Sequence, residues 1–158
     1  NGVALDRGFS CIGCGMASVS TYINTLGRTE EAFEFYRSVF GGEFLDLVRF
    51  RDMDLGPASA NLSEADGNAI LHISLAILGG HVIEGTDAMA SMGHQLVVGT
   101  NFSINLHPDS RSEADRLYAG LSVGSASAPG MADMPWGARI FRLTDPDGYK
   151  LTISSERA

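Results

Sequence analysis

The sequence contains few cysteines, no long apolar run and few basic residues, and each shortage narrows the range of functions. The only cysteines, Cys11 and Cys14, form a C-x-x-C motif in a glycine-rich start. A structural zinc site needs two further ligands at suitable spacing, and a redox pair of this type usually opens a helix after a strand. Neither context is visible around this motif, so we expect neither a zinc nor a redox role.

Charge and hydropathy exclude further partners. No apolar run approaches the roughly 20 residues that cross a bilayer, so we expect no membrane partner. The chain has 11 Lys and Arg against 19 Asp and Glu, a formal net charge of -8 without a basic cluster. Because this charge repels phosphate backbones, we expect no nucleic-acid partner, and a small molecule or a second copy of the chain remains.

The beginning of the chain lacks regular periodicity. Residues 1–15 precede a plausible start at Met16, and we expect them to be a tag or a disordered extension. They do not contain a basic segment followed by an apolar signal core, which predicts a cytoplasmic protein.

The end of the chain has the clearest strand signals. Residues 138–144 and 149–154 alternate or are apolar, and they flank the turn sequence Asp-Pro-Asp-Gly at residues 145–148. Pro146 presets the turn, and Asp145 can accept a hydrogen bond from its backbone, so we expect a β-hairpin. Leu151 and Ile153 then lie on one face of the hairpin. Its other face carries Lys150, Thr152 and Ser154.

The two halves of the chain repeat one pattern. In the first half, a short strand over residues 19–25 precedes a helix over 30–40. Thr29 is a candidate cap for this helix, and its apolar stripe is formed by Ala32, Phe35, Tyr36, Val39 and Phe40.

The helix is followed by three further predicted strands. The first covers residues 43–50, and a long loop over 51–68 separates it from two strands joined at Gly79-Gly80. The register of these two strands places Ser74 across from Glu84, with His72 one diagonal step away.

The second half starts with a predicted strand over residues 97–106. A helix with capping-box spacing at Ser110 and Glu113 follows, then a weak strand within 123–133 and the hairpin. The segment EAFEFY at 31–36 matches EADRLY at 113–118 in Glu, Ala and Tyr. The sequence therefore predicts an α+β protein built from a strand-helix-strands repeat.

Three segments carry a family resemblance: EAFEFYRSVFGGE, ILHISLAILGGHVIEGTDAM and WGARIFRLTDPDGYKLTIS. In this order the chain resembles the PhnB-like branch of the vicinal oxygen chelate superfamily, which includes glyoxalase I, extradiol dioxygenases and bleomycin-resistance proteins. The resemblance implies two βαβββ modules, at residues 16–92 and 93–158, that form a cup-shaped mixed sheet with the site inside. It also implies a homodimer, and the open sheet edges of the repeat point the same way.

Metal-dependent members of this superfamily have four ligand positions, two in each module. Matched to this sequence, the resemblance places them at Thr21, near Glu84, on Asn101 or Ser103, and at Thr152. Only Glu84 is a good ligand, because hydroxyl and amide groups do not replace the imidazoles and carboxylates that a transition metal requires. We therefore expect no tightly held metal and no cofactor, with a divalent metal as the alternative.

The candidate pocket residues are His72, Ser74, Glu84, Asn101, Ser103, Trp136 and Thr152. His72 beside Glu84 could act as a general base oriented by a carboxylate, or could simply form hydrogen bonds within the sheet. Trp136 could line the mouth of the pocket or anchor the core. Two functions remain open: a binder of a small apolar or aromatic molecule, and a glyoxalase-type or dioxygenase-type enzyme that uses Glu84 and His72.

Overall fold

The computed structural model describes residues 18–54, 56, 62–135 and 137–155. The expectations for residues 1–15, for the motif of Cys11 and Cys14, and for Trp136 lie outside these residues.

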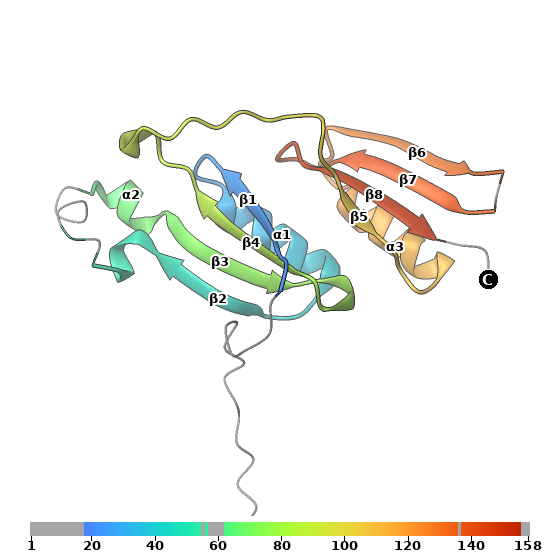
Figure 1. Ribbon diagram of the computed structural model, residues 1–158, viewed down its shortest axis with the longest axis horizontal. Helices are drawn as coiled ribbons and strands as arrows, with labels where there is room; N and C mark the ends of the chain where they lie inside the picture. Colours follow the sequence, from blue (N-terminus) through green and yellow to red (C-terminus); the bar gives the residue numbers. More distant parts are fainter. Residues whose placement is uncertain (1–17, 55, 57–61, 136, 156–158) are drawn as a thin grey trace, which may run out of the picture.

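The described chain forms two four-stranded sheets with the same topology (Figure 1). The first module contains β1 (Thr21–Thr25), α1 (Thr29–Phe40), β2 (Phe44–Arg49), the short helix α2 (Glu64–Asn68), β3 (Ile70–Ala76) and β4 (Val82–Asp87). The second contains β5 (Ile104–Leu106), α3 (Arg111–Leu121), β6 (Ser127–Asp133), β7 (Arg139–Thr144) and β8 (Lys150–Ser155). The strand orders β1-β4-β3-β2 and β5-β8-β7-β6 confirm the predicted repeat of βαβββ units in a mixed α+β fold.

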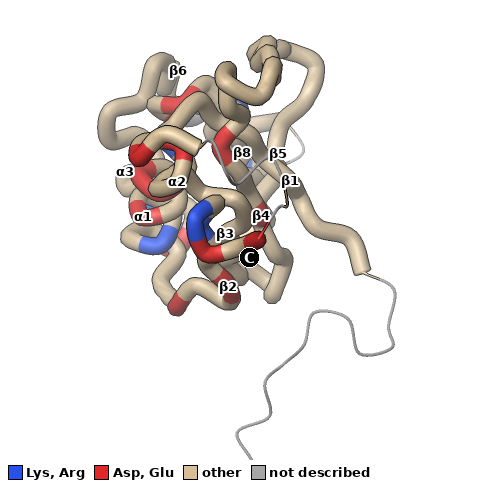
Figure 2. The backbone as a smooth tube through the Cα atoms, turned by 90° about the vertical axis from the view of Figure 1, so that its left-hand side faces the viewer, with Lys and Arg blue, Asp and Glu red and all other residues tan. Residues whose placement is uncertain are grey.

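In each sheet the first strand of the module runs parallel to the last, and the other pairs are antiparallel. Helices α1 and α3 lie on one side of the molecule, and the strands lie on the other (Figures 1 and 2). Each sheet therefore has a helix-covered face and a face turned away from the helices, which we call the open face. Within the described segments, no helix is both long and apolar enough to cross a bilayer.

The helix-covered face of the first sheet is packed around Phe33. This side chain is fully buried, although the predicted stripe contained Phe35 and omitted Phe33. The cause is Gly85 on β4, where a Cβ atom would lie 2.5 Å from Cε2 of the Phe33 ring. The missing side chain leaves room for the phenyl group, whereas Phe35 and Phe40 lie only partly buried at the margin of the core.

The start of α1 is capped from a distant strand. We expected Thr29 to be the cap, but the helix begins at Thr29, and the side chain of the preceding residue makes no capping bond. Instead, Oδ1 of the buried Asp87 accepts hydrogen bonds from the Thr29 backbone nitrogen at 3.1 Å and its hydroxyl at 2.7 Å. A carboxylate at this position satisfies a free N–H group and interacts favourably with the helix dipole.

The two modules share one core through α1 and α3. Val39 of α1 packs against Gly120 of α3, where a Cβ atom would lie 3.1 Å from a Val39 methyl group. Tyr36 of α1 donates a hydrogen bond from its hydroxyl to Asp145, in the turn between β7 and β8. The Tyr149 hydroxyl donates to the Asn24 carbonyl oxygen of β1. Hydrogen bonds of two tyrosine hydroxyls therefore join the first module to the hairpin of the second, and the one between Tyr36 and Asp145 is buried.

The hairpin of β7 and β8 is confirmed, with Asp145 accepting hydrogen bonds from the backbone of Asp147 and Tyr149. The predicted strand over residues 97–106 is wrong for most of its length, because only Ile104–Leu106 pairs with β8. The residues before it form an extended loop that leaves Val97 88% and Phe102 65% exposed. Alternation of residue types indicated a strand, but β8 supplies partners to three residues only.

Candidate functional site

Polar side chains gather on the open face of the second sheet because of the register of β7 and β8. Phe141 and Leu143 are buried on the helix-covered side, where Phe141 stacks on Tyr118 of α3 at a centroid distance of 4.5 Å. Arg142 and Thr144 therefore project to the open face, since neighbouring residues of a strand point to opposite sides. Arg142 is paired with Thr152 across the hairpin.

The same face of β8 carries Lys150 and Thr152, as the sequence predicted. Lys150 is paired with Thr144, and Thr152 is also paired with Asn105 of β5. Leu151 and Ile153 are buried on the other side.

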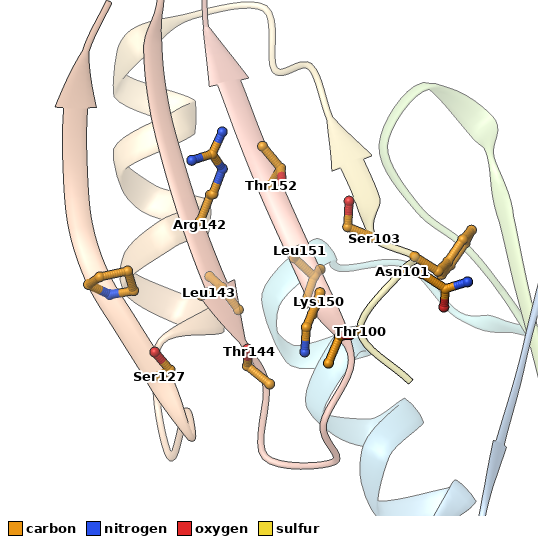
Figure 3. Close-up of a pocket in the computed structure, with 12 residues that line it drawn as sticks. Thr100, Asn101, Ser103, Ser127, Arg142, Leu143, Thr144, Lys150, Leu151 and Thr152 are labelled. Carbon is orange, nitrogen blue, oxygen red and sulfur yellow. The ribbon is translucent and has the colours of Figure 1, made fainter. Parts of the chain in front are cut away.

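These side chains line a pocket of about 400 Å³ on the open face, which we call the open-face pocket (Figure 3). Three of the predicted site residues contribute to it: Asn101 and Ser103 from the loop before β5, and Thr152 from β8. Sequence reasoning missed Arg142 and left Lys150 out of the site, although the alternation of the hairpin places both on this face. In Figure 3 Arg142 lies beside Thr152, and Lys150 lies beside Thr144 toward the turn.

A second, more apolar pocket of about 220 Å³ adjoins the open-face pocket. The two share Asn101, Phe102 and Lys150 as lining residues. Its other walls include Val97 and Val98 of the loop and Tyr22 of β1. Hydroxyl and charged groups on one side and apolar groups on the other therefore border one continuous region of surface.

Three further predicted site residues, His72, Ser74 and Glu84, lie on the first sheet and do not line the open-face pocket. Ser74 is paired with Glu84, as predicted, and its buried hydroxyl has no hydrogen-bond partner among the described residues. Glu84 accepts a hydrogen bond from the Ser20 hydroxyl at 2.5 Å, and the His72 ring contacts the Tyr22 ring at a centroid distance of 6.2 Å. In the part of the chain that the structure describes, His72 and Glu84 are not hydrogen-bonded to each other.

Thr21, the position counted as the first metal ligand, is not the residue paired with Glu84. Thr21 is paired with Ile83, whose side chain is buried beneath α1, and its hydroxyl is 2.9 Å from Nε2 of His81. Tyr22 instead lies beside Glu84 on the open face. Burial and the neighbouring Glu84 raise the pKa of Tyr22, partly offset by a hydrogen bond with Thr86, so its phenol stays protonated and is a weak donor for a cation.

The second module offers no better ligands at the corresponding positions. Asn105, rather than Asn101 or Ser103, is the direct neighbour of Thr152, and its amide nitrogen lies 2.9 Å from Nε2 of His107. Across the described segments, no three His, Cys, Asp or Glu side chains are grouped so that they could hold a metal. The residues present therefore do not fit the four-ligand metal site of the superfamily, because Glu84 is the one good donor among them.

Comparisons with known proteins identify the family. Residues 25–153 match the family model described as the Glyoxalase/Bleomycin resistance protein/Dioxygenase superfamily, and the chain belongs to this superfamily. A comparison with curated proteins gave no match.

Solved structures share the fold at low sequence identity. Protein PA1353 from Pseudomonas aeruginosa is 24% identical with a TM-score of 0.75, and the match covers 90% of this chain and all of that one. The PhnB protein from Bacillus cereus is 18% identical with a TM-score of 0.68, covering 88% and 99% of the two chains. The fosfomycin resistance protein FosX from Listeria monocytogenes is 12% identical with a TM-score of 0.58, covering 90% and 94%.

Proposed function

We propose that this chain is a PhnB-like protein that binds a small molecule with an apolar or aromatic part in the open-face pocket, without a tightly held metal. The observation that carries the proposal is the pocket itself. It places Asn101, Ser103 and Thr152 around one concave surface next to apolar side chains. Ligand sites commonly combine apolar walls with a few polar groups that orient the ligand, in volumes of about 300–1,000 Å³.

The donor chemistry supports binding that does not depend on a metal. Thr152 and its neighbour Asn105 offer a hydroxyl and an amide, which bind transition metals weakly. The alternative, a metal-dependent enzyme that uses Glu84 and His72, would need further imidazole or carboxylate groups near Glu84. The described neighbours of Glu84 are instead Ser20, Tyr22 and Ser74.

Titration with the neutral fluorescent probe phenylnaphthylamine tests the proposed site. We expect saturable binding to the wild type that Thr152→Phe weakens at least tenfold, since a phenyl group at this position fills the pocket (~1.4 kcal/mol per factor of ten). Ser154→Phe is the matched control, because Ser154 lies on the same strand and face but does not line the pocket. Equal binding by both variants would place the probe elsewhere and refute the proposed site.

Elemental analysis addresses the metal separately. We expect dialysed protein to carry far less than one zinc, nickel or manganese ion per chain. About one ion per chain that Glu84→Gln releases would favour the enzyme alternative.

We also propose that the chain forms a homodimer. Among the described residues, the two outer strands of each sheet are paired on one side only, and Leu45 and Leu47 on the outer strand β2 are exposed. Exposed apolar residues on an open edge favour association with another surface.

A further inference from the structure

Most arginine side chains in the described segments have a partner within the protein, whereas two cationic side chains have none. Six arginines form ion pairs with carboxylates: Arg28, Arg37, Arg49, Arg51, Arg116 and Arg139. Arg111 donates a hydrogen bond to the Gly137 carbonyl oxygen. Within the same described segments, Arg142 and Lys150 have neither an ion pair nor a hydrogen bond to the protein, and Lys150 is the only lysine of the sequence.

These two unpaired cations line the same pocket. Arg142 and Lys150 occupy diagonal positions on adjacent strands, since Arg142 is paired with Thr152 and Lys150 with Thr144. Diagonal side chains on one face of an antiparallel pair begin about 7–8 Å apart, within reach of long side chains. The hydroxyl groups of Ser103, Ser127 and Thr152 lie around them, and the described lining of the pocket contains no carboxylate (Figure 3).

This arrangement departs from the rest of the surface. The chain has a net charge of -8, and six of the seven other Arg and Lys side chains in the described segments lie beside carboxylates. Arg142 and Lys150 nevertheless share a concave site without a carboxylate. Two like charges on one face repel each other, and a bound anion relieves that repulsion. A guanidinium offers a planar fork for an oxyanion, and an ammonium adds a flexible point charge.

We propose that the ligand is an amphipathic anion, with a carboxylate or phosphate group at Arg142 and Lys150 and an apolar part toward Phe102, Val97 and Val98. The inference rests on the proposed function, because it names the chemical class bound at the same site. The apolar direction follows from the adjoining pocket, which shares Lys150 and Phe102 with the open-face pocket. Serine and threonine hydroxyls complete the donors for the anionic oxygens.

A pair of matched probes separates this inference from the proposed function. Anilinonaphthalene sulfonate has the aromatic skeleton of phenylnaphthylamine and adds one permanent negative charge. We expect the wild type to bind the sulfonate more tightly than the neutral probe. Arg142→Gln or Lys150→Gln should weaken binding of the sulfonate about five- to tenfold more than binding of the neutral probe. The advantage of the sulfonate should shrink several-fold when salt is raised, because the pocket is open to solvent.

Arg139→Gln is the matched control variant. It removes an arginine from the same strand, but Arg139 pairs with Asp115 of α3 and Asp133, and it does not line the pocket. We expect this variant to bind both probes as the wild type does. An equal loss of sulfonate binding in Arg139→Gln would mean that net charge alone governs binding, and it would overturn the inference.

The outcomes for the two proposals differ. If the wild type binds both probes equally and Thr152→Phe blocks both, the proposed function stands and the anionic class is wrong. If neither probe binds, both proposals fail.

Competition then distinguishes the anionic groups. Naphthoate and naphthyl phosphate should displace the sulfonate probe better than neutral naphthalenemethanol, and the stronger of the two identifies the group. Equal displacement by all three compounds would overturn the anionic class.

Lys150 also allows a direct chemical readout. As the chain has one lysine, acetylation at this position can be followed by peptide mass spectrometry without competing lysine sites. We expect the better naphthyl competitor to slow acetylation of Lys150 several-fold. Unchanged acetylation at a saturating concentration would remove Lys150 from the site and overturn its part in the proposal.

Discussion

Removal of the Tyr36 hydroxyl should destabilise the whole molecule, because the bond from Tyr36 to Asp145 joins the two modules. Asp145 is 1% exposed, and its Oδ2 atom accepts the Tyr36 hydrogen bond while Oδ1 accepts from the backbone of Asp147 and Tyr149. In Tyr36→Phe the ring remains, but Oδ2 is left without its protein donor. A hydrogen bond to a charged group contributes about 1.5–3 kcal/mol, so we expect the free energy of unfolding to fall by about 2 kcal/mol.

The pH dependence of this loss has a defined sign. Burial raises the pKa of Asp145, whereas the hydrogen bonds from Tyr36 and the turn backbone oppose that rise. The pKa of Tyr36 is also raised, chiefly by burial and by Asp145, so its hydroxyl remains a donor throughout the accessible range. A folded pKa above the unfolded value means that the contribution of Asp145 to stability falls as pH rises between the two values. Because the hydroxyl favours the ionised form, the penalty of Tyr36→Phe should grow as pH rises through the folded pKa.

Urea unfolding followed by circular dichroism measures the loss at several pH values. Tyr118→Phe is the control, since it removes a hydroxyl that donates to the Ala128 carbonyl oxygen at 3.1 Å near the surface. We expect the control to lose less than about 1 kcal/mol. A loss of under about 0.5 kcal/mol in Tyr36→Phe, unchanged with pH, would refute the role of the bond between the modules.

Three other results are expected. Gly85→Ala should lower the free energy of unfolding by about 1–3 kcal/mol in urea, because the added Cβ atom would overlap the Phe33 ring. The control Gly67→Ala should be close to neutral, because its Cβ atom would meet the Arg51 Cβ atom at an ordinary 3.5 Å. Equal losses in the two variants would contradict the packing around Phe33. Asp87→Asn should lower the free energy of unfolding by about 1–3 kcal/mol. The amide nitrogen replaces a carboxylate oxygen that accepts a hydrogen bond from Thr29, or the one that accepts from the Ile70 backbone nitrogen at 2.8 Å. A variant with the melting temperature of the wild type would contradict the capping role of Asp87. Light scattering should give a dimer mass at micromolar concentrations, and a monomer mass throughout would exclude the homodimer.

Local sequence signals predicted much of the fold. The turn residues Asp145 and Pro146 defined the hairpin, and the glycines between β3 and β4 fixed a register that places Ser74 opposite Glu84. The capping role of Ser110 is also confirmed, since its hydroxyl accepts from the Glu113 backbone nitrogen. Each of these features depends on residues close together in the sequence.

Features that depend on distant residues were not predictable in the same way. The burial of Phe33 depends on the absence of a side chain at Gly85, and the cap of α1 comes from Asp87, which is 58 residues from Thr29. Thr21 was chosen in place of Tyr22 because counting along the chain does not reveal which residue lies beside Glu84.

The candidate site shows the same limit. Alternation alone indicates that Arg142 and Lys150 share a face of the hairpin. Only the arrangement of the remaining charges shows that, among the described residues, both lack an acidic partner. Asn101, Ser103 and Thr152 were predicted as site residues through the family resemblance, and the structure brings them to one pocket.

Ligand binding by metal-stripped protein decides between metal-independent binding and a metal-dependent enzyme. Protein dialysed against a chelator is titrated with phenylnaphthylamine, before and after addition of zinc, nickel or manganese. We expect saturable binding without metal and a dissociation constant that changes less than about twofold when metal is added. Binding that appears only after addition of a metal, and that Glu84→Gln abolishes, would contradict it.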